Sequence, residues 1–350
     1  MINTITGIVI TGTSALSAAG TGVAAIQELV HSGGDALTDI PFDVIAAEGY
    51  RWGMHSGFKA SDFMSPMKAR KMDRCSQFAV SAVGMALADA GLDLKEIAPE
   101  RVGITLGSGF CGVSSSAEFI TGYFTAGVQG LMPMIFPNTV PNAPASNASI
   151  EHGIKGPNAT MVQRFCSAES AFMLACRYIE EGRADVMLTG GIDELIPLMI
   201  KGFAAMGQMK PGSAPYGEGA GIIVLESAEH AARRHAAVKS VVESITMVGR
   251  TVPGREAEAH DLLTDRANVS SIVSLSGTVS DVPALMERVS GRPMIDSGRV
   301  IGRSLAMGGT AMAVLLAALE AGQQGLHLAA SPDGPYYAIC FRKGPPVVQS

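Results

Sequence analysis

Unbroken apolar segments alternate along the chain with segments in which apolar residues recur every three or four positions. The first kind predicts buried strands and the second predicts amphipathic helices. Strands are expected at 7–13, 101–109, 159–163, 184–193, 219–227, 240–248, 270–275 and 336–342. Helices are expected at 22–33, 74–92, 143–152, 166–181, 228–236, 281–290 and 305–322. This alternation predicts a layered α/β fold.

The predicted elements follow one another without a linker or a low-complexity stretch. From Lys239 onward the alternation of strands and helices begins again, which favours two α/β halves with a boundary near residue 229. We therefore expect residues 1–228 and a shorter 229–350 to pack as one compact unit. Residues 132–158, rich in proline and asparagine, are expected to form an ordered loop that leads into the helix at 143–152.

The composition excludes several classes of function. Hydrophobic residues make up 47% and charged residues 17% of the chain, with 41 glycines and 19 methionines, which is typical of a heavily buried protein. A net charge of −6 without a basic run argues against a nucleic-acid partner, and no apolar run is long enough to span a membrane. The densest group of cations is Lys68, Arg70, Lys71 and Arg74. We interpret it as a solvated helix start, with a docking patch for an acidic carrier protein as the alternative.

The five cysteines show no paired spacing, no Cys-X-X-Cys motif and no histidine at a metal-ligand spacing. They are Cys75, Cys111, Cys166, Cys176 and Cys340. This pattern is typical of a reducing compartment and argues against a structural zinc site. The first residues lack the features of a secretory signal. We therefore expect a cytoplasmic protein that uses no metal and no cofactor.

Four stretches together resemble the β-ketoacyl-acyl-carrier-protein synthases of the thiolase fold. They are "IVITGTSALSAAGTG", "FPNTVPNAPASNASIEHGIKGPN", "ADVMLTGGIDE" and "GEGAGIIVLESAEHAARRHA". The resemblance implies a five-layered αβαβα fold of two similar halves that works as a dimer. It also implies a reaction in which a cysteine takes an acyl chain as a thioester, and a carbanion from decarboxylated malonyl-carrier protein attacks that thioester. A thiolate at a helix N-terminus and two histidines, one supported by a lysine, serve this chemistry.

The position of the family's nucleophile holds phenylalanine in this chain. In the family the cysteine lies nine residues after the glycine of the Gly-Pro-Asn turn and seventeen before the glycine that ends the next helix. Counted from Gly156 and from Gly182, both spacings lead to Phe165. Cys166 is the next residue, and one step on a helix turns a side chain by about 100°. We therefore interpret Cys166 as buried packing and keep it as the fallback nucleophile.

The other catalytic positions of the family are replaced as well. The first histidine corresponds to Ser276 in "SLSGT", the second to Arg303 in "IGRSLAMGGTA", and the supporting lysine to Gly298. The glycine-rich gate near the C-terminus of the family corresponds to "SPDGPYY" at 331–337. None of the seven histidines falls at either catalytic position. Six of them are expected at the surface, and the seventh, His152, is expected to pack at the pairing surface.

The stretch 132–158 resembles the part of the family's fold that forms the dimer interface and the inner end of the acyl tunnel. The interface or tunnel candidates are Met132, Met134, Phe136, Arg164 and Phe165; core packing is the alternative for the first three. The segments 202–218 and 249–270 are shorter than in the family, which puts access of a carrier protein to this subunit in doubt.

Loss of catalysis with retention of the pairing surface resembles the chain-length factor, or ketosynthase β subunit, of type II polyketide synthases. The resemblance implies a subunit inactive alone that forms a heterodimer with an active ketosynthase and meets the acyl carrier protein through that complex. Its setting would be polyketide, polyene or fatty-acid synthesis. Two alternatives stay open. One is a divergent condensing enzyme that uses Cys166 with Arg303 and Ser276, and the other is a homodimeric, non-catalytic binding protein.

Overall fold

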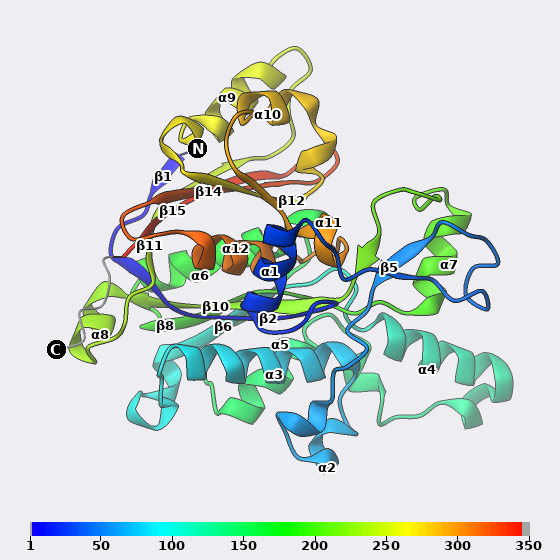
Figure 1. Cartoon of the computed structure of the whole chain (residues 1–350). Helices are drawn as coiled ribbons and strands as arrows, with labels where there is room; N and C mark the ends of the chain where they lie inside the picture. Colours follow the sequence, from blue (N-terminus) through cyan, green and yellow to red (C-terminus); the bar gives the residue numbers. More distant parts are fainter. Residues whose placement is uncertain (1, 345–350) are drawn as a thin grey trace.

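A mixed sheet forms the frame of the protein in the computed structural model, which describes residues 2–344 (Figure 1). Ten of its strands follow one another in the order β7-β6-β8-β10-β2-β11-β15-β14-β12-β13. The first five are β7 Asn158–Met161, β6 Val102–Gly107, β8 Val186–Asp193, β10 Gly219–Ser227 and β2 Ile8–Ser17. The others are β11 Ser240–Val248, β15 Tyr336–Lys343, β14 Gln324–Ala330, β12 Ile272–Gly277 and β13 Met294–Asp296. A short antiparallel pairing between β2 and β11 joins the two sets.

The two sets of strands form two of five layers (Figure 1). The helices α3 and α5 cover the outer face of the first set, α9 and α10 cover the second, and α6 and α12 lie between the two sets. The helices are α1 Val23–Ser32, α2 Pro66–Ala69, α3 Arg74–Asp89, α4 Val113–Ala126, α5 Ala143–His152, α6 Ser167–Glu180, α7 Pro197–Ala205, α8 Ala228–Arg233, α9 Glu256–Thr264, α10 Pro283–Arg288, α11 Ser297–Ile301 and α12 Gly308–Ala318. This is the expected αβαβα arrangement.

The two sets share one topology. In each set, two parallel pairings are followed by two antiparallel ones. In the first set, β6 pairs in parallel with β7 and β8, and the antiparallel pairs are β8 with β10 and β10 with β2. In the second set, β12 pairs in parallel with β13 and β14, and the antiparallel pairs are β14 with β15 and β15 with β11. In chain order, the central helix α6 lies between β7 and β8, and the central helix α12 lies between the corresponding strands β13 and β14. We infer from this repetition that the two halves meet near residue 229, between β10 and β11.

The middle layer is held close to both sheets by small residues. The helix α12 is apolar around most of its circumference and buried along most of its length, as a helix enclosed between two sheets must be. Gly107 on β6 faces the backbone at Ser167, and Gly221 on β10 faces the backbone at Thr310. A Cβ atom at either glycine would collide with that backbone. The sheets therefore reach the first turns of α6 and α12 directly.

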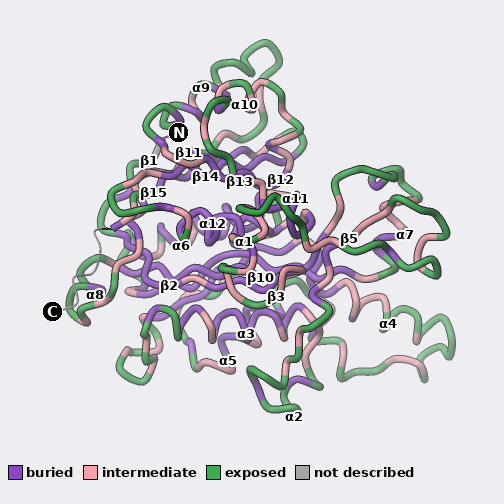
Figure 2. Tube along the Cα trace, viewed as in Figure 1, coloured by how far each residue is buried: buried purple, intermediate pink, exposed green. Residues whose placement is uncertain are grey.

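Most of the predicted elements are present with ends shifted by a few residues. The burial pattern agrees, with the strands and the middle layer buried and the loops around them exposed (Figure 2). Sequence reasoning did not predict α4, α7, α9 or β14. The pattern of α4 is misleading because its large apolar side chains Ile120, Tyr123 and Phe124 are exposed. Among the described residues, no helix is long and apolar enough to cross a membrane.

Candidate functional site

Phe165 lies where a strand of one sheet passes into the middle layer. The chain leaves β7 and forms a single 3-10 turn, Arg164–Cys166, before α6 begins at Ser167. Arg164 opens this turn at a φ of 51°, in the left-handed region that few residues other than glycine adopt. The ring of Phe165 is half-buried, and a Cβ atom added to Gly277 would come within 2.9 Å of the Phe165 Cβ atom. Position 165 and the end of β12 are therefore in contact.

Cys166 is fully buried and faces away from solvent. Its thiol donates a hydrogen bond to the carbonyl oxygen of Pro335 at 3.2 Å. Burial raises the pKa of the Cys166 thiol well above its ordinary value, and the nearby Glu169 carboxylate acts in the same direction. A thiol in these surroundings stays protonated at neutral pH and is a poor nucleophile.

Three contacts tie the turn around Phe165 to the segment 331–337. The Arg164 guanidinium donates to the carbonyl oxygen of Pro332 at 3.0 Å, and Cys166 donates to Pro335 as described. The Tyr337 hydroxyl donates to the side-chain oxygen of Gln163 at 3.2 Å. The segment predicted to replace the family's gate is therefore bonded directly to the residues on both sides of Phe165.

Ser276 lies one residue before Gly277, at the end of β12. Its side chain is buried, and its hydroxyl has no hydrogen-bond partner among the described residues. Position 165 contacts the next residue, Gly277. The correspondence of Ser276 to the first histidine of the family stays a prediction.

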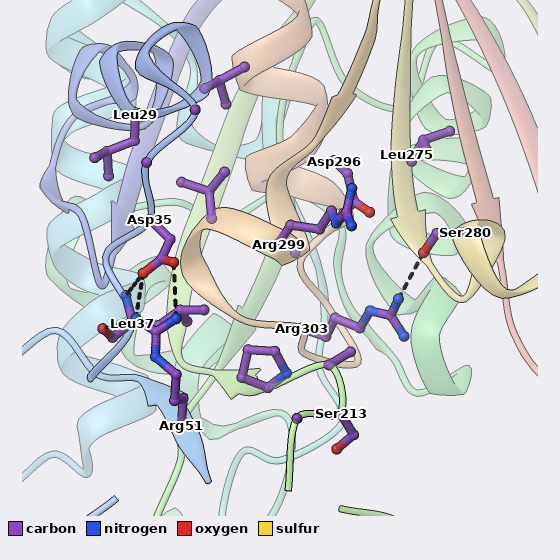
Figure 3. A pocket seen from close by; sticks show the side chains of 18 of the residues that line it. Leu29, Asp35, Leu37, Arg51, Ser213, Leu275, Ser280, Asp296, Arg299 and Arg303 are labelled. Atoms are coloured by element: carbon purple, nitrogen blue, oxygen red, sulfur yellow. Dashed lines mark hydrogen bonds and ion pairs between the residues drawn. The ribbon is translucent and has the colours of Figure 1, made fainter. Parts of the chain in front are cut away.

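Gly298 and Arg303 also lie together. A Cβ atom added to Gly298 would lie 2.9 Å from the Arg303 Cγ atom, so the arginine side chain occupies the space beside Gly298. The Arg303 guanidinium donates to an Asp281 carboxylate oxygen at 2.8 Å and to the Ser280 hydroxyl at 2.8 Å (Figure 3). Arg303 is thus a paired cation directed toward the turn after β12.

Sequence reasoning missed a buried contact between a carboxyl group and an imidazole that joins the two halves. Glu169 on α6 and His327 on β14 are both fully buried, and the Glu169 Oε1 atom lies 2.9 Å from the His327 Nε2 atom. The Glu169 Oε2 atom has no hydrogen-bond partner among the described residues. A side chain at Gly308, the first residue of α12, would collide with the Glu169 carboxylate. The pair therefore links α6 and β14 next to the start of α12.

The expectation that six histidines lie at the surface is wrong for four of them. The buried histidines are His55, His230, His260 and His327, each no more than 9% exposed. His327 belongs to "GLHLAA", and the continuous apolar character of that stretch was the available signal for burial. His152 is partly buried and bonds the carbonyl oxygen of Val80 at 3.0 Å, so it packs against α3 within the chain.

The candidates in the loop 132–158 are exposed, which rules out core packing for them. Met132 is 45%, Met134 76% and Phe136 59% exposed. They continue a set of exposed apolar side chains on and after α4. We call this set the apolar face; its members are Ile120, Tyr123, Phe124, Val128, Met132, Met134 and Phe136. A groove of about 470 Å³ between α4 and Met132 adjoins it.

The cationic cluster is partly neutralised within the chain. Lys68 pairs with Glu151 on α5, and Arg74 pairs with the buried carboxylate of Glu218. Arg74 also lies over the Phe78 ring, 4.8 Å from its centroid. These contacts give the cluster a structural role at the start of α3.

Comparisons with known proteins place the chain in a single family. The family model described as "Beta-ketoacyl synthase, N-terminal domain" matches residues 6–231. A 3-oxoacyl-acyl-carrier-protein synthase 2 from Vibrio cholerae is 31% identical over 260 residues. That match covers 69% of this chain and 63% of the relative, so the chain spans less than two thirds of its length.

Solved structures show the same fold at low sequence identity. The ishigamide ketosynthase/chain length factor superposes with a TM-score of 0.79 at 22% identity, covering 97% of this chain and 99% of that one. A type II polyketide ketosynthase in complex with its acyl-carrier protein gives a TM-score of 0.78 at 20% identity, covering 96% and 99%. The expected thiolase-like fold is thereby confirmed.

Proposed function

This chain belongs to the β-ketoacyl synthase family, and from that premise we propose that it is a non-catalytic subunit which pairs with an active β-ketoacyl-acyl-carrier-protein synthase. The setting is chain elongation in polyketide, polyene or fatty-acid synthesis, and the subunit meets the acyl carrier protein only through the complex. The observation that carries the proposal is the packing at the position predicted for the nucleophile: Phe165 stands there, and the thiol beside it, Cys166, is fully buried and donates to the Pro335 carbonyl oxygen.

The chemistry of condensation explains why this packing matters. Acyl transfer requires a thiolate that can reach the acyl carbonyl, and decarboxylation requires donors aimed at the developing enolate oxygen. Phe165 supplies no nucleophile, and the Arg303 guanidinium is engaged by Asp281 and Ser280. Among the positions predicted from the family, only Ser276 offers a free polar atom, and a neutral hydroxyl alone cannot replace both histidines.

The alternative of a divergent enzyme rests on Cys166. Its thiol is fully buried, has a raised pKa and donates to the Pro335 carbonyl oxygen. An acyl group could reach it only after the turn at 164–166 had separated from the segment 331–337. These features favour the packing role for Cys166 over the nucleophilic one.

The apolar face offers a surface for the partner subunit. Water-exposed apolar side chains gathered on one element are typical of protein interfaces. The strand β7 lies at one end of the sheet order and pairs only with β6 among the described strands, so one of its backbone edges is open. An open strand edge and an exposed apolar surface each suit pairing with a second ketosynthase-like chain.

The native mass of the protein isolated from its own host tests the proposal. We expect a one-to-one complex with a second ketosynthase-like chain. Phe124→Asp on the apolar face should dissociate that complex, because a carboxylate would be buried without a partner. Val269→Asp is the matched control: Val269 is also exposed, lies outside the apolar face, and its substitution should leave the complex intact.

Two results would contradict the proposal. A homodimer without a second chain would favour the non-catalytic homodimeric alternative. An acyl thioester on Cys166, found by mass spectrometry after incubation with acyl-carrier protein, would establish the divergent enzyme instead.

A further inference from the structure

A cavity of about 950 Å³ opens beside α11, separate from Phe165 (Figure 3). Its walls come from the end of α1 and the loop after it, from β5 (Arg51–Gly53), from the shortened segment at 212–215, and from the region between β12 and Arg303. Phe165, Cys166 and Ser276 are not among the residues that line it. A volume near the upper end of the range for small-molecule sites is far more than a single inorganic ion requires.

Three guanidinium groups reach this cavity, and two of them are neutralised at short range. Arg51 donates to both Asp35 carboxylate oxygens, at 3.0 and 2.7 Å (Figure 3), and Arg303 pairs with Asp281. The backbone N–H of Arg299 on α11 bonds Asp296, but the Arg299 side chain is exposed and makes no hydrogen bond or ion pair with any described residue. Of the three cations, Arg299 is therefore the one available to a ligand.

Asp296 is the carboxylate nearest to Arg299 along the chain, and its surroundings weaken its charge. Burial raises the pKa of Asp296, although the neighbouring Arg303 and Arg299 charges act in the opposite direction. The two side chains form no hydrogen bond or ion pair with each other among the described residues, so Asp296 does not engage the Arg299 guanidinium at short range.

The same cavity has an apolar wall. It is lined by Leu275 of β12, Met286 of α10, Met294 of β13 and Val300 of α11. Methionine side chains have three rotatable bonds and adjust to the shape of an apolar group. Met294 is 42% exposed, so this wall is open to an incoming ligand.

The geometry points to a binding site for a carboxylate with an apolar chain, such as a short- or medium-chain acyl carboxylate. The carboxylate pairs with Arg299, and the chain lies against Met286 and Met294. A guanidinium binds a carboxylate through two parallel hydrogen bonds, which provides orientation as well as affinity. The site lies within one chain and does not depend on the proposed pairing with a ketosynthase.

Titration of the isolated chain with octanoate tests this site. The fluorescence of Trp52, the chain's single tryptophan and the neighbour of the lining residue Arg51, reports on the cavity, and isothermal calorimetry gives an independent reading. We expect saturable binding of octanoate and much weaker binding of 1-octanol and of inorganic phosphate. 1-Octanol lacks the carboxylate that would pair with Arg299, and inorganic phosphate lacks the apolar chain.

Variants locate the site. Arg299→Ala should weaken octanoate binding about tenfold or more, and Arg299→Lys should retain part of the affinity. Met294→Asp should weaken it as well, by placing a carboxylate on the apolar wall. Arg255→Ala is the control, because Arg255 is exposed on the segment before α9 and does not line the cavity. All of these side chains are exposed, so the variants should fold.

Three outcomes would overturn the inference. The first is no saturable binding of octanoate to the wild-type chain. The second is binding that Arg299→Ala and Met294→Asp leave unchanged, which would place octanoate elsewhere. The third is equal affinity for octanoate and 1-octanol, which would show that the cavity does not recognise the negative charge.

Discussion

Replacing Phe165 by cysteine asks whether the phenyl ring is what closes the predicted nucleophile position. Truncating a fully buried phenylalanine to alanine costs roughly 3–5 kcal/mol. Because Phe165 is only half-buried, we expect Phe165→Cys to lower the free energy of unfolding by about 2 kcal/mol, which leaves a folded protein. The five native cysteines are all buried, so the new thiol at position 165 would be the most accessible one in the chain.

The difference in reactivity between positions 165 and 166 follows from the pKa values of the two thiols. Each unit by which burial raises a thiol pKa removes about tenfold from the thiolate fraction at neutral pH, and opening the hydrogen bond to Pro335 costs about 1 kcal/mol more. We therefore expect the thiol introduced at 165 to react at least about 100-fold faster than Cys166 with an octyl-substituted iodoacetamide.

Peptide mass spectrometry of the labelled protein distinguishes the two cysteines. Labelling at 165 alone, in a variant shown by circular dichroism to be folded, would establish that the ring closes an otherwise intact pocket. A folded Phe165→Cys protein that stays unlabelled would refute the reasoning, because the entrance would then be closed elsewhere. Labelling of Cys166 at a comparable rate in the wild type would refute the packing role of Cys166.

Three further predictions concern stability, measured by urea unfolding. Gly298→Lys should lower the free energy of unfolding by about 1–3 kcal/mol, because the new side chain collides with Arg303; adding Arg303→Ala should recover part of that loss. Glu169→Ala should cost about 1–3 kcal/mol by leaving the Nε2 atom of buried His327 without its partner, and adding His327→Leu should cost less than the sum of the two single changes. Burial raises the pKa of Glu194 to about 7 from 4.5, so the unfolded chain loses this proton first and the wild type loses stability as the pH rises between those values. Glu194→Gln should therefore match the wild type below pH 4.5 and exceed it by up to about 3 kcal/mol above pH 7, whereas a constant difference would contradict the assignment.

The sequence predicted the fold well because most of its elements are buried. Strands such as β8 and β10 are short, continuous apolar runs bounded by turn residues, and their length and flanking residues distinguish them from buried helices. Among the missed elements, β14 is as buried as these strands, but α4 has a different relation to solvent. The helix α4 exposes its large apolar side chains, so it lacks the stripe that marks a helix packed on a core.

Only those site residues that lie at a fixed spacing from a sequence motif could be predicted. The motif spacings led to Phe165, Ser276, Gly298 and Arg303. The structure brings Gly298 and Arg303 into contact and places Phe165 against Gly277, the neighbour of Ser276. The pair of Glu169 and His327 could not be found by counting, because its members are 158 residues apart and meet only when the two halves pack. The hydrogen bonds between the 164–166 turn and the segment 331–337 were unpredictable for the same reason.

Most of the predicted positions are matched to their neighbours within the chain. Arg303 fits beside Gly298 because Gly298 has no side chain, and the Phe165 Cβ atom fits beside Gly277 for the same reason. Such matching is expected because protein interiors are packed as densely as crystals, and the exception is the buried Ser276 hydroxyl, which has no hydrogen-bond partner among the described residues. Here the arginine has Asp281, the thiol of Cys166 has Pro335, and the turn is bonded to the segment that follows β14. These contacts support the proposed non-catalytic subunit, for which the exposed apolar side chains of α4 and the loop after it offer a pairing surface.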